Sequence, residues 1–169
     1  MIIGSGDIAS VLPDSDLLFF ASGVSNSQET RDIEFGREMS LLLDQPRDKH
    51  IVYFSSLAIF YSETPYTIHK RRMEEIIKMN FKKYTIIRIG NITWGDNPHT
   101  IINYFKMMIS QNQKFPIQNT FRYVIDLDEF LHWVDLIPEW SCEMNCPGTK
   151  MKVSEIVQEI KNGTLWRPK

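Results

Sequence analysis

Short apolar runs along the chain alternate with longer segments in which apolar residues recur every three or four positions. The short runs predict buried β-strands, and the longer periodic segments predict amphipathic helices. The predicted strands are Met1–Ile3, Asp16–Ala21, His50–Phe54, Tyr84–Arg88 and Arg122–Ile125. The predicted helices cover residues 29–43, Tyr66–Met79, 99–110 and 127–137, and a last helix carries Val153, Ile156, Val157 and Ile160. Strands that alternate with helices predict an α/β fold with a parallel sheet and helices on both faces.

The composition is that of an ordinary globular domain. The chain has 169 residues, of which 43% are apolar and 24% are charged, and this predicts a single domain over residues 1–169. A net charge of −2 gives no broad electrostatic field for nucleic acid or a membrane surface. We find no signal peptide and no apolar run that would span a bilayer, so a cytoplasmic protein is expected.

The rarer residue types add little chemistry of their own. Cys142 and Cys146 are the only cysteines, and without a second pair of cysteines or histidines they predict neither a disulfide framework nor a zinc site. No metal is therefore expected. The segment Cys142–Gly148 is expected to be a loop or an edge strand. The four tryptophans are expected to be packing residues: Trp94, Trp133, Trp140 and Trp166.

The most informative chemistry lies after the apolar strand His50–Phe54. Ser55 and Ser56 close this strand, and ten residues later a helix begins with Tyr66 and carries Lys70 four positions on, which places the last two side chains on one face. A phenol ordinarily titrates near ~10, and a neighbouring ammonium lowers that pKa. Together with a serine hydroxyl, this pair can exchange a proton with an alcohol or carbonyl. The alternative is an aromatic residue packed at a helix start beside a solvated lysine.

A glycine-rich turn follows the first predicted strand. Gly4-Ser5-Gly6-Asp7-Ile8-Ala9 has the form G-x-G-x-x-A and is expected to open a helix whose N-terminus faces a phosphate. Gly4 permits the tight turn, and Gly6 permits close approach of the phosphate. The alternative is that both glycines serve the turn without any ligand. Asp7 argues against tight phosphate binding, because its carboxylate would oppose the anion.

These segments together resemble the extended branch of the short-chain dehydrogenase/reductase superfamily, which contains nucleotide-sugar epimerases, dehydratases and reductases. The resemblance implies a Rossmann-like three-layer fold and catalysis by Ser56, Tyr66 and Lys70. It implies binding of NAD or NADP by Gly4, Gly6, Ala21, Ser22 and Lys70. Arg88-Ile89-Gly90-Asn91 with Gly95 is similar to the family's R-x-x-N-x-x-G segment, and Arg122 is similar to its phosphate-binding arginine, so Asn91 and Arg122 are expected on the substrate side.

The chain departs from the family pattern near its beginning. Only Ser10–Ser15 separate the glycine turn from the strand at Asp16, whereas a strand–helix–strand unit needs ~30 residues. Two of the usual N-terminal βα units are therefore expected to be missing, and with them the adenosine half of the cofactor site. The substrate-side portion at the C-terminal end is very small. The chain is interpreted as a minimised member of the family.

Two classes of function follow. The first is an NAD(P)-dependent epimerase, dehydratase or reductase that acts on a nucleotide-linked sugar, which the resemblance places in bacterial surface polysaccharide biosynthesis. The alternative is a non-catalytic module that binds a nucleotide or nucleotide sugar and has lost the dinucleotide. The resemblance also implies a homodimer through the Tyr66/Lys70 helix. His69 is expected on the surface, and Arg122 is expected to pair with phosphate or with Asp126 or Asp128.

Overall fold

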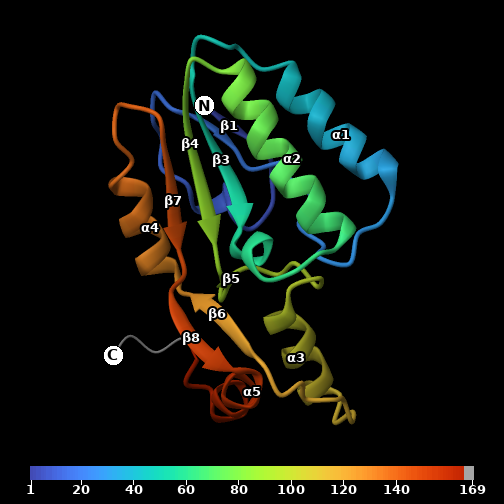
Figure 1. The fold of residues 1–169 in the computed structure, drawn as a ribbon. Helices are drawn as coiled ribbons and strands as arrows, with labels where there is room; N and C mark the ends of the chain where they lie inside the picture. The colour runs from blue at the N-terminus through green and yellow to red at the C-terminus, as the bar shows by residue number, and fades with distance from the viewer. Residues whose placement is uncertain (166–169) are drawn as a thin grey trace.

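A computed structural model describes residues 1–165, and its largest element is a five-stranded parallel sheet (Figure 1). The strand order is β1-β2-β3-β4-β7, and every neighbouring pair is parallel, as predicted. Residues 142–146, which were expected to be a loop or an edge strand, form the strand at one edge of this sheet. The strands are β1 (Ile2–Ile3), β2 (Leu18–Phe20), β3 (His50–Ser56), β4 (Lys83–Ile89) and β7 (Cys142–Cys146).

Helices cover both faces of this sheet. The helices α1 (Asp32–Leu43) and α2 (Pro65–Asn80) lie on one face, and α4 (Leu127–Asp135) lies on the other (Figure 1). Successive strand residues point to opposite faces, so two separate cores form. The core under α1 and α2 includes Leu18, Phe20, Ile51, Tyr53 and Ile86. The core under α4 includes Phe19, Val52, Phe54, Ile87 and Phe130. The predicted three-layer α/β fold is confirmed.

The structure also confirms the reduced N-terminal part. β1 is an edge strand and pairs directly with β2, with Ile2 opposite Phe19 and Ile3 opposite Phe20. The connection between them contains only the 3-10 turn η1 (Ala9–Val11). No α-helix follows the glycine turn, so that part of the prediction is wrong. Pro13 explains the short turn, because a proline drives the preceding residue into the extended region, and Leu12 has φ −71° and ψ 140°.

A small lobe, which the sequence did not predict as a separate sheet, lies at the carboxyl ends of the large sheet. It contains β5 (Asn91–Ile92), β6 (Phe121–Ile125) and β8 (Thr149–Lys152), in the order β5-β6-β8. The β5–β6 pair is parallel, and the β6–β8 pair is antiparallel. The helices α3 (Ile101–Ser110) and α5 (Val153–Asn162) complete it. Its core consists of Ile102, Phe105, Val124, Val153, Ile156 and Val157.

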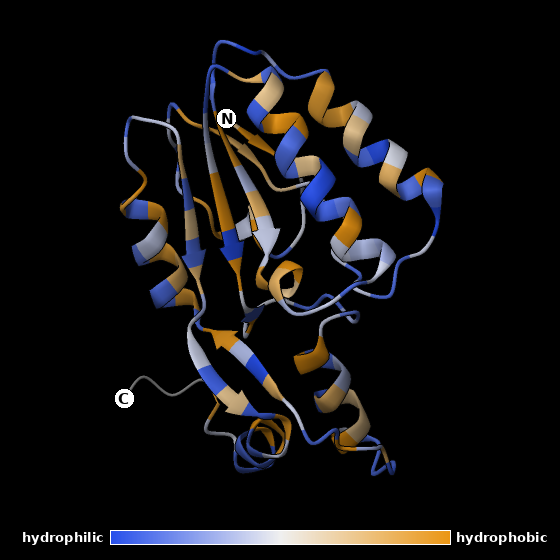
Figure 2. Cartoon of the chain, viewed as in Figure 1, coloured by the Kyte–Doolittle hydropathy of each residue, from blue (hydrophilic) through white to orange (hydrophobic). Residues whose placement is uncertain are grey.

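Hydropathy changes along the central strands (Figure 2). β3 and β4 are hydrophobic in the middle of the sheet and become polar at their carboxyl ends, where Ser56 and Arg88 lie. Polar groups therefore gather where the large sheet meets the small lobe. None of the helices in the described part of the chain is both long and apolar enough to cross a membrane.

The tryptophans only partly follow the packing prediction. Trp94 and Trp133 pack against the core under α4. Trp140 is 69% exposed, so the prediction is wrong there. It lies in the connection between α4 and β7. Trp166 lies outside the described residues.

Candidate active site

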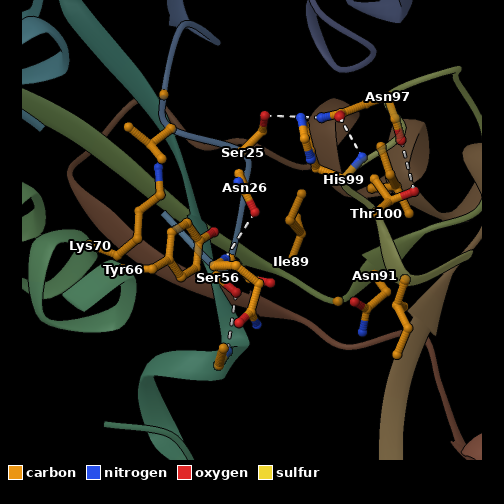
Figure 3. Close-up of a pocket in the computed structure, with 18 of the residues that line it drawn as sticks. Ser25, Asn26, Ser56, Tyr66, Lys70, Ile89, Asn91, Asn97, His99 and Thr100 are labelled. Carbon is orange, nitrogen blue, oxygen red and sulfur yellow. Dashed lines mark hydrogen bonds between the residues drawn. The ribbon is translucent and has the colours of Figure 1, made fainter. Parts of the chain in front are cut away.

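A cavity of about 1310 Å³ lies between the carboxyl ends of the large sheet and the small lobe (Figure 3). Ligands of parallel α/β sheets bind at this edge. Gly4 does not line the cavity, but the other predicted site residues do: Gly6, Ala21, Ser22, Ser56, Tyr66, Lys70, Asn91 and Arg122. In Figure 3, Lys70, Tyr66 and Ser56 lie together on one side, and Asn91 lies on the other.

The two serines at the end of β3 have different partners. Ser55 is buried, and its hydroxyl donates to Glu74 Oε1 at 2.6 Å. Ser56 is half-buried and accepts the Ala58 N–H at 3.2 Å, which caps the 3-10 turn η2 (Leu57–Phe60). A hydroxyl that accepts one hydrogen bond still has its own proton to donate. Ser56 is therefore the serine that can donate to a ligand in the cavity.

Tyr66 lies in the first turn of α2, because the helix begins directly before it. Pro65 occupies the first helical position, and Thr64 and Thr67 form a reciprocal capping pair. The four-residue step then brings Lys70 Nζ to 5.8 Å from the centre of the Tyr66 ring. The predicted buried stripe of α2 is present and consists of Tyr66, Lys70, Met73 and Ile77.

The ammonium group of Lys70 is held by a buried carboxylate on α1. Glu38 Oε1 accepts from Lys70 Nζ at 3.1 Å and from the Tyr53 hydroxyl at 2.6 Å. Lys70 Nζ also donates to the Tyr53 hydroxyl at 3.0 Å. Glu38 Oε2 accepts the Val24 N–H at 2.7 Å and lies 2.9 Å from His69 Nε2. This buried network connects α1, α2, β3 and the loop after β2.

The ionisation of Glu38 follows from these contacts. Burial by itself raises the pKa of a carboxyl group, but here the charge of Lys70 and hydrogen bonds from His69, Tyr53 and Val24 outweigh burial and hold the pKa of Glu38 at about 2. Burial, together with the nearby Glu38 carboxylate, raises the pKa of Tyr53 well above its ordinary value. At neutral pH the carboxylate is therefore ionised and the Tyr53 phenol is neutral.

His69 lies in the interior, so the prediction of a surface position is wrong. It is 7% exposed and stacks on Phe35, with the two ring centres 4.5 Å apart. His69 is three residues after Tyr66, and three helical residues turn through about 300°. The two side chains therefore point only about 60° apart around α2. Because α1 packs beside α2, it also covers the side of α2 that carries His69.

Glu38 is the site residue that sequence reasoning missed. It is three residues after Phe35 and four residues before Leu42, so it falls on the apolar face of α1. A charged residue on a core-facing stripe signals a buried partner, because a buried charge requires one. Gly23 was also missed: a Cβ there would lie 2.6 Å from Lys70 Nζ and 3.0 Å from Glu38 Oε1.

The glycine turn differs from the predicted phosphate cradle. Gly4 has φ +131°, and a Cβ on it would lie 2.5 Å from the Ala21 carbonyl oxygen, so this glycine allows β1 and β2 to approach at their ends. Gly6 faces open space, since a Cβ there would meet no atom within 4 Å. The turn therefore lies open to the cavity at Gly6, but no helix N-terminus stands behind it.

Asp7 fastens the small lobe to this turn. Its Oδ1 and Oδ2 accept the N–H groups of Asp96 and Asn97, each at 3.1 Å, and its carbonyl accepts Trp94 Nε1 at 3.1 Å. Gly95 has φ +82°, and a Cβ on it would lie 2.0 Å from Asp7 Cγ. The Asp7 carboxylate thus already has two backbone donors.

The two predicted substrate residues lie on the small-lobe side. Asn91 Nδ2 donates to the Tyr123 carbonyl at 2.9 Å, which fixes the amide at the junction of the sheets. Arg122 donates to the Phe121 carbonyl at 2.9 Å and to Gln118 Oε1 at 3.1 Å. Arg122 forms no ion pair with Asp126 or Asp128, the alternatives considered from the sequence, and Asp126 caps α4. The guanidinium therefore remains available to an anion.

Arg88, in the R-x-x-N segment, has a structural position. It is buried and pairs with Glu74 through Nη2–Oε2 at 2.6 Å, and the same nitrogen contacts Glu143. These hydrogen bonds raise the pKa of Arg88. The pairs join α2 to β4 and β7 behind the cavity. Within residues 1–165, no group of His, Cys, Asp and Glu side chains is arranged to hold a metal ion.

Comparison with known proteins shows similarity in structure and not in sequence. No protein-family model and no curated protein matches the chain. Solved structures of nucleotide-sugar enzymes of the extended short-chain dehydrogenase/reductase family superpose on most of it. The chain shares the fold of these enzymes. The resemblance inferred from the sequence is confirmed at the level of fold.

Three of these structures illustrate the similarity. The Bordetella bronchiseptica enzyme WbmG in complex with NAD and UDP is 14% identical, with a TM-score of 0.69 over 88% of this chain and 56% of its own. UDP-glucose 4-epimerase from Thermotoga maritima with UDP-glucose is 15% identical, with a TM-score of 0.67 over 91% and 62%. The capsular polysaccharide assembling protein CapF from Staphylococcus aureus is 17% identical, with a TM-score of 0.60 over 89% and 45%. The chain thus spans about half to two thirds of their lengths.

Proposed function

We propose that the chain acts as an NAD(P)-dependent epimerase, dehydratase or reductase of a nucleotide-linked sugar. The observation that carries this proposal is the placement of Ser56, Tyr66 and Lys70 on one side of a large cavity at the carboxyl end of the parallel sheet. Tyr66 is the proton shuttle in this proposal, Ser56 donates a hydrogen bond to the reacting oxygen, and Lys70 holds a sugar or ribose hydroxyl.

The cavity fits the nicotinamide half of the cofactor better than its adenosine half. Gly6, Ala21 and Ser22 give an open, small-residue lining beside the catalytic side chains. When bound, NAD or NADP would supply the hydride acceptor or donor. On the adenosine side, β1 is already the sheet edge, and a 3-10 turn replaces the helix that would face the pyrophosphate.

The substrate side supports a diphosphate ligand. Arg122 lines the cavity and has no carboxylate partner in the described part of the chain, and Asn91 lies nearby at the lobe junction. UDP and UDP-glucose occur in the complexes of two proteins with this fold. Our proposal includes a cytoplasmic role in bacterial surface polysaccharide synthesis, since one protein with this fold, CapF, is a capsular polysaccharide assembling protein. It also includes a homodimer through α2, where Ile68 and Met79 are 55% and 82% exposed.

A second candidate function is favoured by the incomplete adenosine side. The chain would bind a nucleotide or nucleotide sugar and use no dinucleotide. Because Asp7 engages the backbone of residues 96 and 97, its carboxylate stands at the turn where a pyrophosphate would run. This candidate retains the cavity and Arg122 but assigns no hydride chemistry to Tyr66.

Thermal unfolding with added ligands separates the two candidates. A ligand that binds only the folded state stabilises it by about 2.7 kcal/mol at a hundredfold excess over its dissociation constant. The enzyme proposal expects the melting temperature to rise with NAD or NADP at millimolar concentration and with UDP- or dTDP-linked sugars. Stabilisation by the sugars alone would favour the binding module. No stabilisation by either class would contradict both.

Replacement of the proposed proton shuttle tests the chemistry. Tyr66→Phe keeps the ring that packs at the start of α2 and removes only the hydroxyl. We expect turnover of the nucleotide sugar to be lost, since general acid–base catalysis contributes about 10²–10⁴-fold to the rate. Cofactor affinity should stay nearly intact. A turnover rate equal to that of the wild type would exclude Tyr66 from the reaction.

A further inference from the structure

The Lys70 ammonium has only part of its hydrogen-bonding capacity in use. It donates to Glu38 Oε1 at 3.1 Å and to the Tyr53 hydroxyl at 3.0 Å. An ammonium has three N–H donors, and among residues 1–165 no other hydrogen-bond acceptor contacts it. Lys70 also lines the cavity (Figure 3). One N–H is therefore left for a ligand.

The charge at this position is balanced. Glu38 is fully buried, Lys70 is 2% exposed, and the two form a direct ion pair. The Tyr53 phenol, which also donates to Glu38, is neutral, and His69 Nε2 lies 2.9 Å from the other carboxylate oxygen. In the low dielectric of the interior, the Lys70–Glu38 pair presents little net charge to a ligand. The remaining N–H of Lys70 therefore acts on a ligand much as an uncharged hydrogen-bond donor would.

The opposite side of the cavity is different. Arg122 has hydrogen bonds to Gln118 and to the Phe121 carbonyl, but its guanidinium makes no ion pair with any described carboxylate. An ionised phosphate gains more from an uncompensated, planar guanidinium than from a compensated ammonium. The two sides of the cavity therefore favour different groups of a ligand.

We propose that Glu38 is a positioning and specificity residue that makes the Lys70 side of the cavity a site for a neutral sugar hydroxyl and rejects phosphate there. The phosphate groups of the ligand are thereby directed to Arg122. This inference rests on the proposed function, because it takes the ligand to be a nucleotide-linked sugar.

The architecture around Glu38 supports this role. The carboxylate also accepts the Val24 N–H at 2.7 Å, so it fixes the loop after β2 that carries Ser22 and lines the cavity. Gly23 leaves the space that the Lys70–Glu38 pair occupies, since any Cβ there would contact both charged groups. One carboxylate thus sets the position of the ammonium and of the neighbouring cavity wall.

The test uses inorganic pyrophosphate as the probe and needs no turnover. Glu38→Gln keeps the size of the side chain and one oxygen acceptor but removes the counter-charge of Lys70. We expect the affinity for pyrophosphate, measured by calorimetry at low salt, to rise about tenfold over the wild type. The gain should disappear in Glu38→Gln/Lys70→Met, because the uncompensated ammonium is then absent.

A matched control separates charge from packing. Tyr53→Phe removes the hydroxyl that contacts both Glu38 and Lys70 but leaves the ion pair, so pyrophosphate affinity should stay at the wild-type value. An unchanged affinity in Glu38→Gln, or a gain that persists without Lys70, would overturn the inference. If Glu38→Gln does not fold, Glu38→Asp, which retains the charge, must fold and show wild-type affinity, and failure of both would make Glu38 a purely structural residue.

The outcome is distinguishable from failure of the proposed function. Nucleotide sugars and dinucleotides that leave the wild-type melting temperature unchanged would refute the function while the pyrophosphate comparison still reports the charge balance at Lys70. Conversely, turnover by the wild type combined with unaltered pyrophosphate binding in Glu38→Gln would keep the function and refute the role of Glu38.

Discussion

The carboxyl group of Glu38 stays ionised in the interior because four groups around it favour the charged form. Burial opposes this, but the Lys70 ammonium and the donors of His69, Tyr53 and Val24 outweigh burial and hold the pKa at about 2, against an ordinary value of 4.5. The carboxyl group therefore binds its proton more weakly in the folded chain than in the unfolded chain. Its ionisation contributes to stability.

This contribution predicts a specific acid sensitivity. It is fully present above a pH of about 4.5 and is lost as the pH falls towards about 2, where the folded carboxyl group takes up a proton. A pKa difference of about 2.5 means that ionisation of Glu38 contributes on the order of 3 kcal/mol to the free energy of unfolding. Urea unfolding between these pH values should show the difference between wild type and Glu38→Gln shrinking.

The control is an exposed glutamate. Glu75→Gln removes one carboxylate whose side chain is 67% exposed, and its unfolding free energy should run parallel to that of the wild type over the same pH range. A difference between wild type and Glu38→Gln that stays constant with pH would show that the buried carboxylate does not carry this stability.

At the scale of elements, α1 contains a glycine at a position where the packing would also allow a larger side chain. Gly36 lies in the interior of the helix, and a Cβ there would meet no atom within 4 Å. Alanine loses less conformational entropy than glycine when a helix forms. We expect Gly36→Ala to raise the unfolding free energy by about 0.5–1 kcal/mol in denaturant titrations.

Gly23→Ala is the matched comparison with the opposite sign. The same added methyl group would contact Lys70 Nζ and Glu38 Oε1, so one member of the ion pair must move. We expect a loss of about 1–3 kcal/mol, the range for overpacking a filled interior. Equal effects of the two substitutions would contradict the close fit at Gly23.

The sequence predicted the elements that have strong apolar patterns and missed those without one. The strands over residues 50–56 and 83–89 and the helix over residues 65–80 follow from their buried runs and stripes. The strand Thr149–Lys152 reads TKMK and has no apolar run, and β5 has only two residues, so long-range pairing with β6 decides both.

In the candidate site, the sequence predicted the residues that have a local pattern and missed the one that depends on long-range packing. Ser56, Tyr66 and Lys70 have fixed spacings on a strand end and a helix start, which bring them to one cavity. The partner of Lys70 lies on another helix, 32 residues away in sequence. Only the packing of α1 against α2 identifies it, and the sole signal in the sequence was a glutamate on an apolar helix face.

At the scale of the whole molecule, the large sheet and the small lobe have separate cores. The cavity lies between them, so its shape depends on what joins them. Asp7 is such a connection, since its carboxylate accepts the backbone N–H groups of residues 96 and 97 in the loop between β5 and α3. Hydrogen bonds to a charged group contribute about 1.5–3 kcal/mol each, so this contact helps to fix the small lobe relative to the large sheet.

Removal of this contact should loosen the lobe and leave the sheet intact. In Asp7→Ala, we expect amide hydrogen exchange over residues 96–110 to become about ten- to a hundredfold faster, while the buried amides of β3 and β4 exchange as in the wild type. Asp96→Ala removes a neighbouring exposed carboxylate but keeps the N–H that contacts Asp7, so it should leave exchange over residues 96–110 unchanged. Exchange over residues 96–110 that stays the same in Asp7→Ala would mean that the lobe is held by its own core, and the cavity would then be rigid without the Asp7 connection.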